Sequence, residues 1–94
     1  MRSIMQFDKQ CYICGRRDQL ERHHAIHGTA GRAKAEALGL WVWLCPEHHR
    51  TGPGAAHGNA ATDLTLKKLA QIAYEKHHTR AEWMKEIGRN YLDT

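Results

Sequence analysis

Four residues whose side chains bind zinc are arranged in the sequence as two pairs. Cys11 and Cys14 are separated by two residues and followed by Gly15, and Cys45 precedes His48 by three positions. A glycine-assisted turn aims both sulfurs of the first pair at one point, and residues three apart share one face of a helix. Two such pairs predict a tetrahedral structural Zn²⁺ site. The alternative interpretation is three buried and chemically inert cysteines.

The histidines form a second group with chemical potential. The chain has eight of them, and the adjacent pairs His23-His24 and His48-His49 are the most distinctive. His49 lies about 100° further round a helix than His48, so it should face away from the zinc, although it is the rival fourth ligand. Neighbours in a strand point to opposite sides, so one histidine of the first pair can bind a metal while the other stays free. Phosphodiester cleavage uses both a cation and a neutral imidazole that accepts a proton from water. Solvated loop histidines are the alternative.

The elements that position these residues are predicted to be a hairpin and a short helix. Residues 20–26 are a plausible strand, and residues 40–44 are a stronger one because they are rich in aromatic and branched side chains. Between them, residues 27–32 are expected to form a glycine-containing loop, followed by a brief helical turn from Ala33 to Leu38. The short helix has Pro46 at its first position and ends before the Thr-Gly-Pro-Gly segment that follows Arg50.

Two further helices are predicted to close the chain. Asp63 is expected to cap the first, and Thr79 and Glu82 have the spacing of a capping box that opens the second. A single domain over residues 1–94 is expected, with the knuckle and metal-binding core in 1–62 and the helical pair in 63–94. The predicted apolar positions are Leu64, Leu66, Leu69, Ile72 and Ala73 in the first helix and Trp83, Met84, Ile87 and Tyr91 in the second.

Composition restricts the class of protein. A chain of 94 residues buries only a modest fraction of its surface on folding and commonly needs a staple such as a metal ion. Three cysteines cannot all pair, which argues against a disulfide framework. No signal peptide or membrane-spanning run is recognisable, so a cytoplasmic protein without a membrane partner is expected. The net charge of +4 is compatible with a polyanionic partner.

The motifs together resemble a known family. The segments that carry the resemblance are Arg2-Ser3-Ile4-Met5, the cysteine knuckle, 23–28, 39–45, His48-His49 and 88–92. They are similar to the ββα-metal (His-Me finger) HNH endonucleases, specifically to short phage and prophage proteins related to the recombination-enhancement nuclease. The resemblance implies an α+β fold with a small zinc-stapled ββα-metal (treble-clef-like) core, a β-hairpin, a short helix and two C-terminal helices.

The resemblance also implies roles for individual histidines. His23, His49 and His57 would hold a second divalent cation, either Mg²⁺, Mn²⁺, Ni²⁺ or Zn²⁺, and His24 would be the general base. His57 could instead be only a phosphate contact. The implied activity is metal-dependent hydrolysis of DNA phosphodiester bonds with little sequence specificity, leaving a 5′-phosphate and a 3′-hydroxyl. Candidate phosphate-binding residues, each as easily explained as plain surface, are Arg22, Arg32, Lys34 and Arg50.

One departure from the family pattern keeps other functions open. The family carries an asparagine eight or nine residues before the helix histidine, where this chain has Leu40 and Trp41, and Asn59 is misplaced for that role. The departure favours a non-catalytic zinc-containing module that binds nucleic acid. A further alternative is a structural subunit that docks through its two C-terminal helices. The family context implies a bacterial cytoplasm, DNA as partner, and a homodimer or a phage recombination protein as further partners.

Overall fold

The computed structural model describes residues 1–93 and is organised around an antiparallel hairpin of two short strands. Strand β1 (Glu21–His24) pairs with β2 (Trp41–Leu44), and the register sets His23 opposite Val42. Side chains alternate across a strand, so His23 and Val42 point into the interior, where both are buried. His24 points to the other side of the hairpin and stays partly exposed. The hairpin confirms the two predicted strands, although both are shorter than the sequence suggests.

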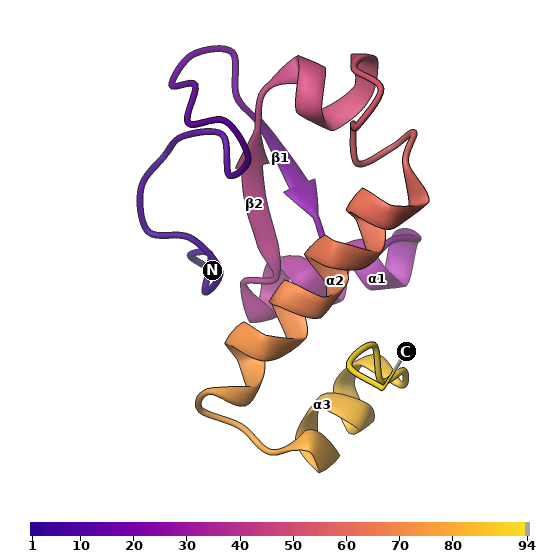
Figure 1. Cartoon of the computed structure of the whole chain (residues 1–94). Coiled ribbons are helices and arrows are strands. Elements are labelled where there is room, and N and C mark those ends of the chain that lie inside the picture. Colours follow the sequence, from indigo (N-terminus) through magenta and orange to yellow (C-terminus); the bar gives the residue numbers. More distant parts are fainter. Residues whose placement is uncertain (94) are drawn as a thin grey trace.

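Within residues 1–93, four helical segments surround the hairpin. Helix α1 (Thr29–Leu38) connects the two strands, and α2 (Ala60–Glu75) is followed by α3 (Arg80–Ile87). A single π-helical turn, η1 (Glu47–Thr51), lies between β2 and α2. Figure 1 shows η1 near one end of the molecule and α3 near the other, with α2 running between them. None of these helices has the length and apolar character needed to cross a membrane. The molecule is a small α+β protein.

The connection between the strands is more helical than the sequence predicts. The predicted loop over residues 27–32 is wrong from Thr29 onwards, because α1 begins there. Gly31 does not interrupt this helix; it allows close packing, since a Cβ there would lie 3.0 Å from the Ile26 side chain. Gly39 ends α1 with a φ of 75°, and a Cβ there would lie 2.3 Å from a backbone oxygen of the N-terminal segment. Glycine is therefore required where α1 turns into β2.

The caps of the last two helices were predicted with mixed success. The prediction that Asp63 caps α2 is wrong: the cap is Asn59, whose Oδ1 accepts a hydrogen bond of 3.0 Å from the backbone N–H of Thr62. Asp63 lies in the first turn instead, because the alanines before it extend the helix. The capping box of Thr79 and Glu82 at the start of α3 is confirmed, with both reciprocal hydrogen bonds present.

Two apolar clusters form the core. The larger one draws on all three α-helices and consists of Ala25, Ile26, Ala35, Leu40, Ala70, Tyr74, Trp83 and Tyr91. The smaller one joins the hairpin to the cysteines and consists of Cys11, Val42, Leu44, Cys45, Ala56 and Leu66. Two residues assigned to buried faces are exposed, Ile72 by 45% and Met84 by 37%. Tyr91 is buried as predicted but lies beyond the end of α3.

Candidate metal centres

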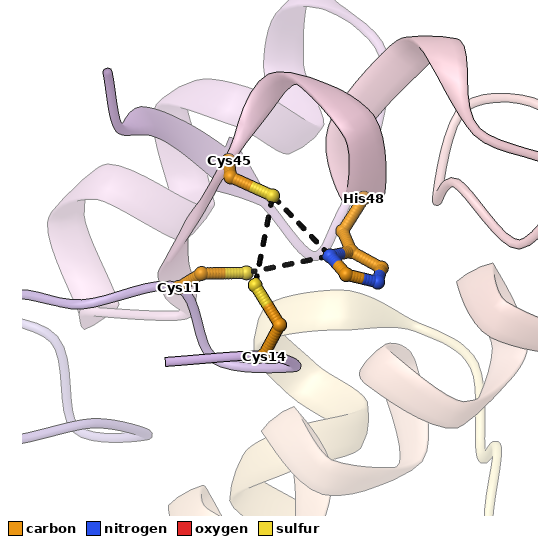
Figure 2. Close-up of side chains that lie close together, drawn as sticks. All are labelled: Cys11, Cys14, Cys45 and His48. Carbon is orange, nitrogen blue, oxygen red and sulfur yellow. Dashed lines mark hydrogen bonds between the residues drawn. The ribbon is translucent and has the colours of Figure 1, made fainter. Parts of the chain in front are cut away.

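Three sulfurs and one imidazole converge beside the start of η1. The Sγ atoms of Cys14 and Cys45 are 3.8 Å apart, and the Nδ1 atom of His48 lies 3.2 Å from Cys45 Sγ and 3.8 Å from Cys11 Sγ. Figure 2 shows the four side chains pointing at one another from the N-terminal loop and the β2–η1 junction. With zinc–sulfur bonds of about 2.3 Å, the edge of a tetrahedral site is about 3.8 Å. These four residues could therefore hold a metal ion such as zinc.

Short backbone hydrogen bonds hold the first pair of sulfurs in place. The N–H of Cys11 donates to the carbonyl of Arg16 at 2.7 Å, and the N–H of Gly15 donates back to the carbonyl of Cys11 at 2.8 Å. The Tyr12 N–H donates to the carbonyl of Trp43 at 2.8 Å, which attaches the knuckle to β2. The N-terminal loop is thus built onto the hairpin at the point where β2 delivers the second pair of ligands.

Charge at the sulfurs is unevenly stabilised. Burial raises the pKa of the Cys11 thiol, but backbone N–H groups of Cys45, Cys14 and Ile13 outweigh it and bring the pKa down to about 6. The pKa of Cys14 is lowered by the Arg16 backbone, but partial burial and the other two thiols reverse this and raise it overall. Thiolates this close repel one another, so a bound cation would relieve a repulsion that the fold imposes.

The η1 turn separates the two adjacent histidines as predicted. His48 faces the cysteines, whereas His49 is buried on the other side of the turn. The prediction of Pro46 at the first helical position is confirmed: its φ of −55° and ψ of −38° are helical, and the π-helical residues of η1 follow from Glu47. The turn is closed by a hydrogen bond of 2.8 Å from the Gly52 N–H to the Glu47 carbonyl.

A second group of donors consists of His23, His49 and His57, as predicted from the sequence. One ring nitrogen from each lies within 4.8 Å of the others, and the Nε2 atoms of His49 and His57 are 2.9 Å apart. His23 is 1% exposed, and its buried Nε2 atom has no hydrogen-bond partner. A buried polar atom without a partner costs free energy, which a metal ion bound to this nitrogen would remove. The three imidazoles could therefore hold a metal ion.

The surroundings keep these imidazoles ready to act as ligands. Burial, reinforced by the neighbouring histidines, lowers the pKa of His23 to about 3, so this ring is neutral at physiological pH. Burial and the adjacent His49 also lower the pKa of His57. The Nδ1 atom of His49 lies 2.7 Å from a carboxylate oxygen of Glu21. A carboxylate that accepts from the far nitrogen of a ligand histidine fixes its tautomer and raises its basicity.

His24 lies next to this centre but outside the donor set. Its Nε2 atom is 2.8 Å from Glu36 of α1, and the same carboxylate accepts two hydrogen bonds from Arg22. A small hollow of about 100 Å³ brings His24 together with the second donor group. The residues that line it are Arg22, His23, His24, His27, Arg32, His49, Arg50 and His57.

The four candidate phosphate-binding residues have different surroundings. Arg22, Arg32 and Arg50 line the hollow that contains the histidines. The guanidinium of Arg22 also lies 3.7 Å from the centre of the Trp41 ring. Lys34 instead forms an ion pair of 2.8 Å with Glu86 of α3.

Two residues near the second donor group were not predicted as ligands. His27 was assigned to a loop and Asp63 to a helix cap, yet the His27 Nε2 atom is hydrogen-bonded to Asp63 Oδ1. One donor atom from each lies within 4.8 Å of a ring nitrogen of His23. The sequence signal was weak, because 36 positions separate His27 from Asp63. Only the position of α2 brings them together.

Asn59 has a structural task on the loop that carries His57. Its Nδ2 atom donates to the carbonyl of Pro53 at 3.3 Å while its Oδ1 atom caps α2.

Comparisons with known proteins add no relative: no family model matches the chain, and no significant match was found among curated proteins or solved structures. The donor geometry is therefore the basis for any functional conclusion.

Proposed function

We propose that this protein is a metal-dependent endonuclease that hydrolyses phosphodiester bonds in DNA. The observation that carries the proposal is the buried, unpartnered Nε2 atom of His23 beside His49 and His57, in the same hollow as His24. This arrangement puts a candidate cation site next to an imidazole outside it, which is the pair that phosphodiester cleavage uses. The proposal includes zinc at Cys11, Cys14, Cys45 and His48 and a ββα-metal core formed by β1, β2 and η1.

The charge of the hollow suits a phosphate ester. Arg22, Arg32 and Arg50 contribute to its lining, and guanidinium groups bind phosphate oxygens through paired N–H donors. Glu21 and Glu36 lie close by, but each is engaged, Glu21 with His49 and Glu36 with Arg22 and His24. Glu36 pairs with Arg22 and Glu21 with Arg50, so Arg32 and a bound cation would supply the net positive charge of the hollow. Contacts to phosphates carry no sequence information, which supports low sequence specificity.

His24 is the proposed general base. The Glu36 carboxylate holds its Nε2 side, which orients the ring and leaves Nδ1 available to accept a proton from water. A divalent ion at His23, His49 and His57 would neutralise the scissile phosphate and stabilise the leaving oxygen. Arg22 shares Glu36 with His24, so it couples the position of the base to that of a phosphate-binding group.

A second candidate is a zinc-containing module that binds nucleic acid without cutting it. The observation that favours it is Trp41 at one position where the nucleases that the chain resembles carry asparagine, together with the Arg22 guanidinium stacked on that ring. In this alternative the basic hollow binds the backbone and the histidine group is a second structural metal site. The resemblance to phage and prophage nucleases, which implies a role in DNA processing, suits either candidate.

A nicking assay separates the two candidates. Purified protein with one zinc per chain would be incubated with supercoiled plasmid and Mg²⁺, Mn²⁺, Co²⁺ or Ni²⁺ in turn. We expect nicking by the parent, loss of at least about 100-fold in His24→Ala, as is typical for removal of a general base, and unchanged zinc content. His77→Ala, an exposed histidine near the end of α2, is the matched control. Absence of nicking by the parent with every metal, combined with retention of DNA in a gel shift, would establish the binding module instead.

A further inference from the structure

The contact between His27 and Asp63 points to a second cation position in the histidine centre. We infer that these two residues bind a further divalent ion beside the one held by His23, His49 and His57, which makes the centre dinuclear. The inference builds on the ion of the proposed function but concerns residues that the function does not use. Its class of ligand is a divalent transition metal or Mg²⁺, because an imidazole and a carboxylate oxygen accept either.

The donors are divided into two overlapping sets. His49 and His57 form one set with His23, and His27 and Asp63 form the other with the same histidine. The rings of His27 and His57 are 6.1 Å apart, and each lies within 5.6 Å of the His23 ring. These three rings therefore form a nearly equilateral triangle, and His23 is close to both pairs of donors.

A single imidazole nitrogen binds one ion at a time, which decides how the sets are filled. With His49 and His57, the His23 Nε2 atom completes a three-imidazole site, so the more tightly bound ion is the one at this site. The second ion then has His27 and Asp63 as protein ligands, with its other positions left for water or phosphate oxygens. Two-metal hydrolytic sites hold their ions about 3.5–4 Å apart and clamp one phosphate between them.

The space beside Asp63 suits this assignment. An open hollow of about 640 Å³ is lined by His27, His57, Asp63 and Arg32 and by the first residues of α1 and α2. A phosphate that completes the coordination of the second ion would meet the Arg32 guanidinium there. The backbone N–H groups at the two helix starts would add to the attraction for an anion.

Lys67 sets the order of filling. Its ammonium group lies 2.8 Å from Asp63 Oδ2, while the other oxygen of the carboxylate faces His27. A neighbouring cation weakens binding of a second cation to the same carboxylate. The cysteine site should therefore fill first, the three-histidine site next and the His27–Asp63 position last.

Manganese titration of zinc-loaded protein tests the inference without any nuclease activity. Bound Mn²⁺ would be counted by metal analysis and observed by electron paramagnetic resonance, because two ions this close give an exchange-coupled spectrum that isolated ions do not. We expect two manganese ions per chain in the parent and one uncoupled ion in Asp63→Asn and His27→Gln. The matched control is Asp18→Asn, which removes an exposed carboxylate that is paired with Arg16 and belongs to neither donor set.

Each outcome decides between the hypotheses. A titration that ends at one manganese in the parent overturns the second position and leaves the three-histidine ion of the proposed function intact. A parent that binds no manganese overturns both, and two coupled ions in both variants overturn the assignment to His27 and Asp63. His27 is 41% exposed, so His27→Gln keeps the test decisive even if Asp63→Asn fails to fold.

Discussion

Replacing Cys14 by serine should destabilise the protein through the loss of metal binding alone. Cys14 is exposed, whereas the two other cysteines are 1% exposed and belong to the smaller apolar cluster. Substitution at Cys11 or Cys45 would change core packing and metal binding together. Cys14→Ser removes a sulfur ligand but no packing, so its effect on the free energy of unfolding measures the ligand.

The size of the chain sets the expected magnitude. Net stability of about 0.05–0.15 kcal/mol per residue gives about 5–14 kcal/mol for 94 residues. A structural zinc contributes on the order of 10 kcal/mol, so one of four ligands is worth roughly 2–3 kcal/mol. For a domain of this size, 1 kcal/mol shifts Tm by about 4–8 °C. Cys14→Ser should therefore lower Tm by roughly 10–20 °C, and complete removal of the metal should unfold most of the chain.

Thermal unfolding followed by circular dichroism would measure both effects, with one equivalent of zinc and again with excess chelator. The chelated samples supply the control, because without metal the parent and the variant should be unfolded to the same extent. Cobalt in place of zinc would show weaker sulfur-to-metal charge transfer in the variant. A stabilising metal at this site would be refuted if the chelator left the Tm of the parent unchanged. The same conclusion would follow if the zinc-loaded variant had the Tm of the zinc-loaded parent.

Three further predictions address other parts of the structure. Glu21→Gln should weaken metal binding at the three-histidine site by about 10–100-fold, because it removes the carboxylate that orients His49; an unchanged Mn²⁺ affinity would contradict this. His23 binds a proton below about pH 6.5 in the unfolded chain but only near pH 3 in the folded chain. Lowering the pH from 7.5 to 5.5 should therefore reduce the free energy of unfolding, by up to about 1.4 kcal/mol for each pH unit below 6.5. Denaturant unfolding should show this loss in the parent relative to His23→Gln, and parallel pH profiles would exclude it. Thr79→Ala should cost about 1 kcal/mol without changing zinc content, and a variant as stable as the parent would mean that the capping box with Glu82 contributes nothing.

The sequence was most informative where ligand chemistry and local geometry coincide. Cys11, Cys14, Cys45 and His48 could be grouped in advance because the spacing within each pair permits only a few arrangements around one ion. The opposite facing of His48 and His49 also follows from helical geometry alone. The capping box of α3 and the two strands depended on equally local rules.

Long-range packing explains what could not be predicted. The intrinsic preference of Gly31 is against helix, which favours a loop, but the residue lies in α1 where a Cβ would crowd Ile26. Asp63 has the side chain of a cap, and only the observed start of α2 shows that it faces His27. Ile72 fits an apolar helix face by spacing, yet it is 45% exposed. These positions depend on how elements meet, which local pattern does not determine.

The η1 turn connects the cysteine site to the histidine site, because it carries the adjacent residues His48 and His49. Gly52 closes this turn, and a Cβ there would lie 2.7 Å from the Glu47 carbonyl oxygen, so no larger residue fits the same turn. The backbone of His57 donates to the carbonyl of His49 at 3.1 Å, which attaches the loop ligand to the same turn. The η1 turn therefore positions His49 and His57, two of the three imidazoles, and its opposite face carries His48, which points at the cysteines. A metal ion at the cysteines would fix that segment, so it would organise the histidine centre through the backbone while taking no part in its chemistry.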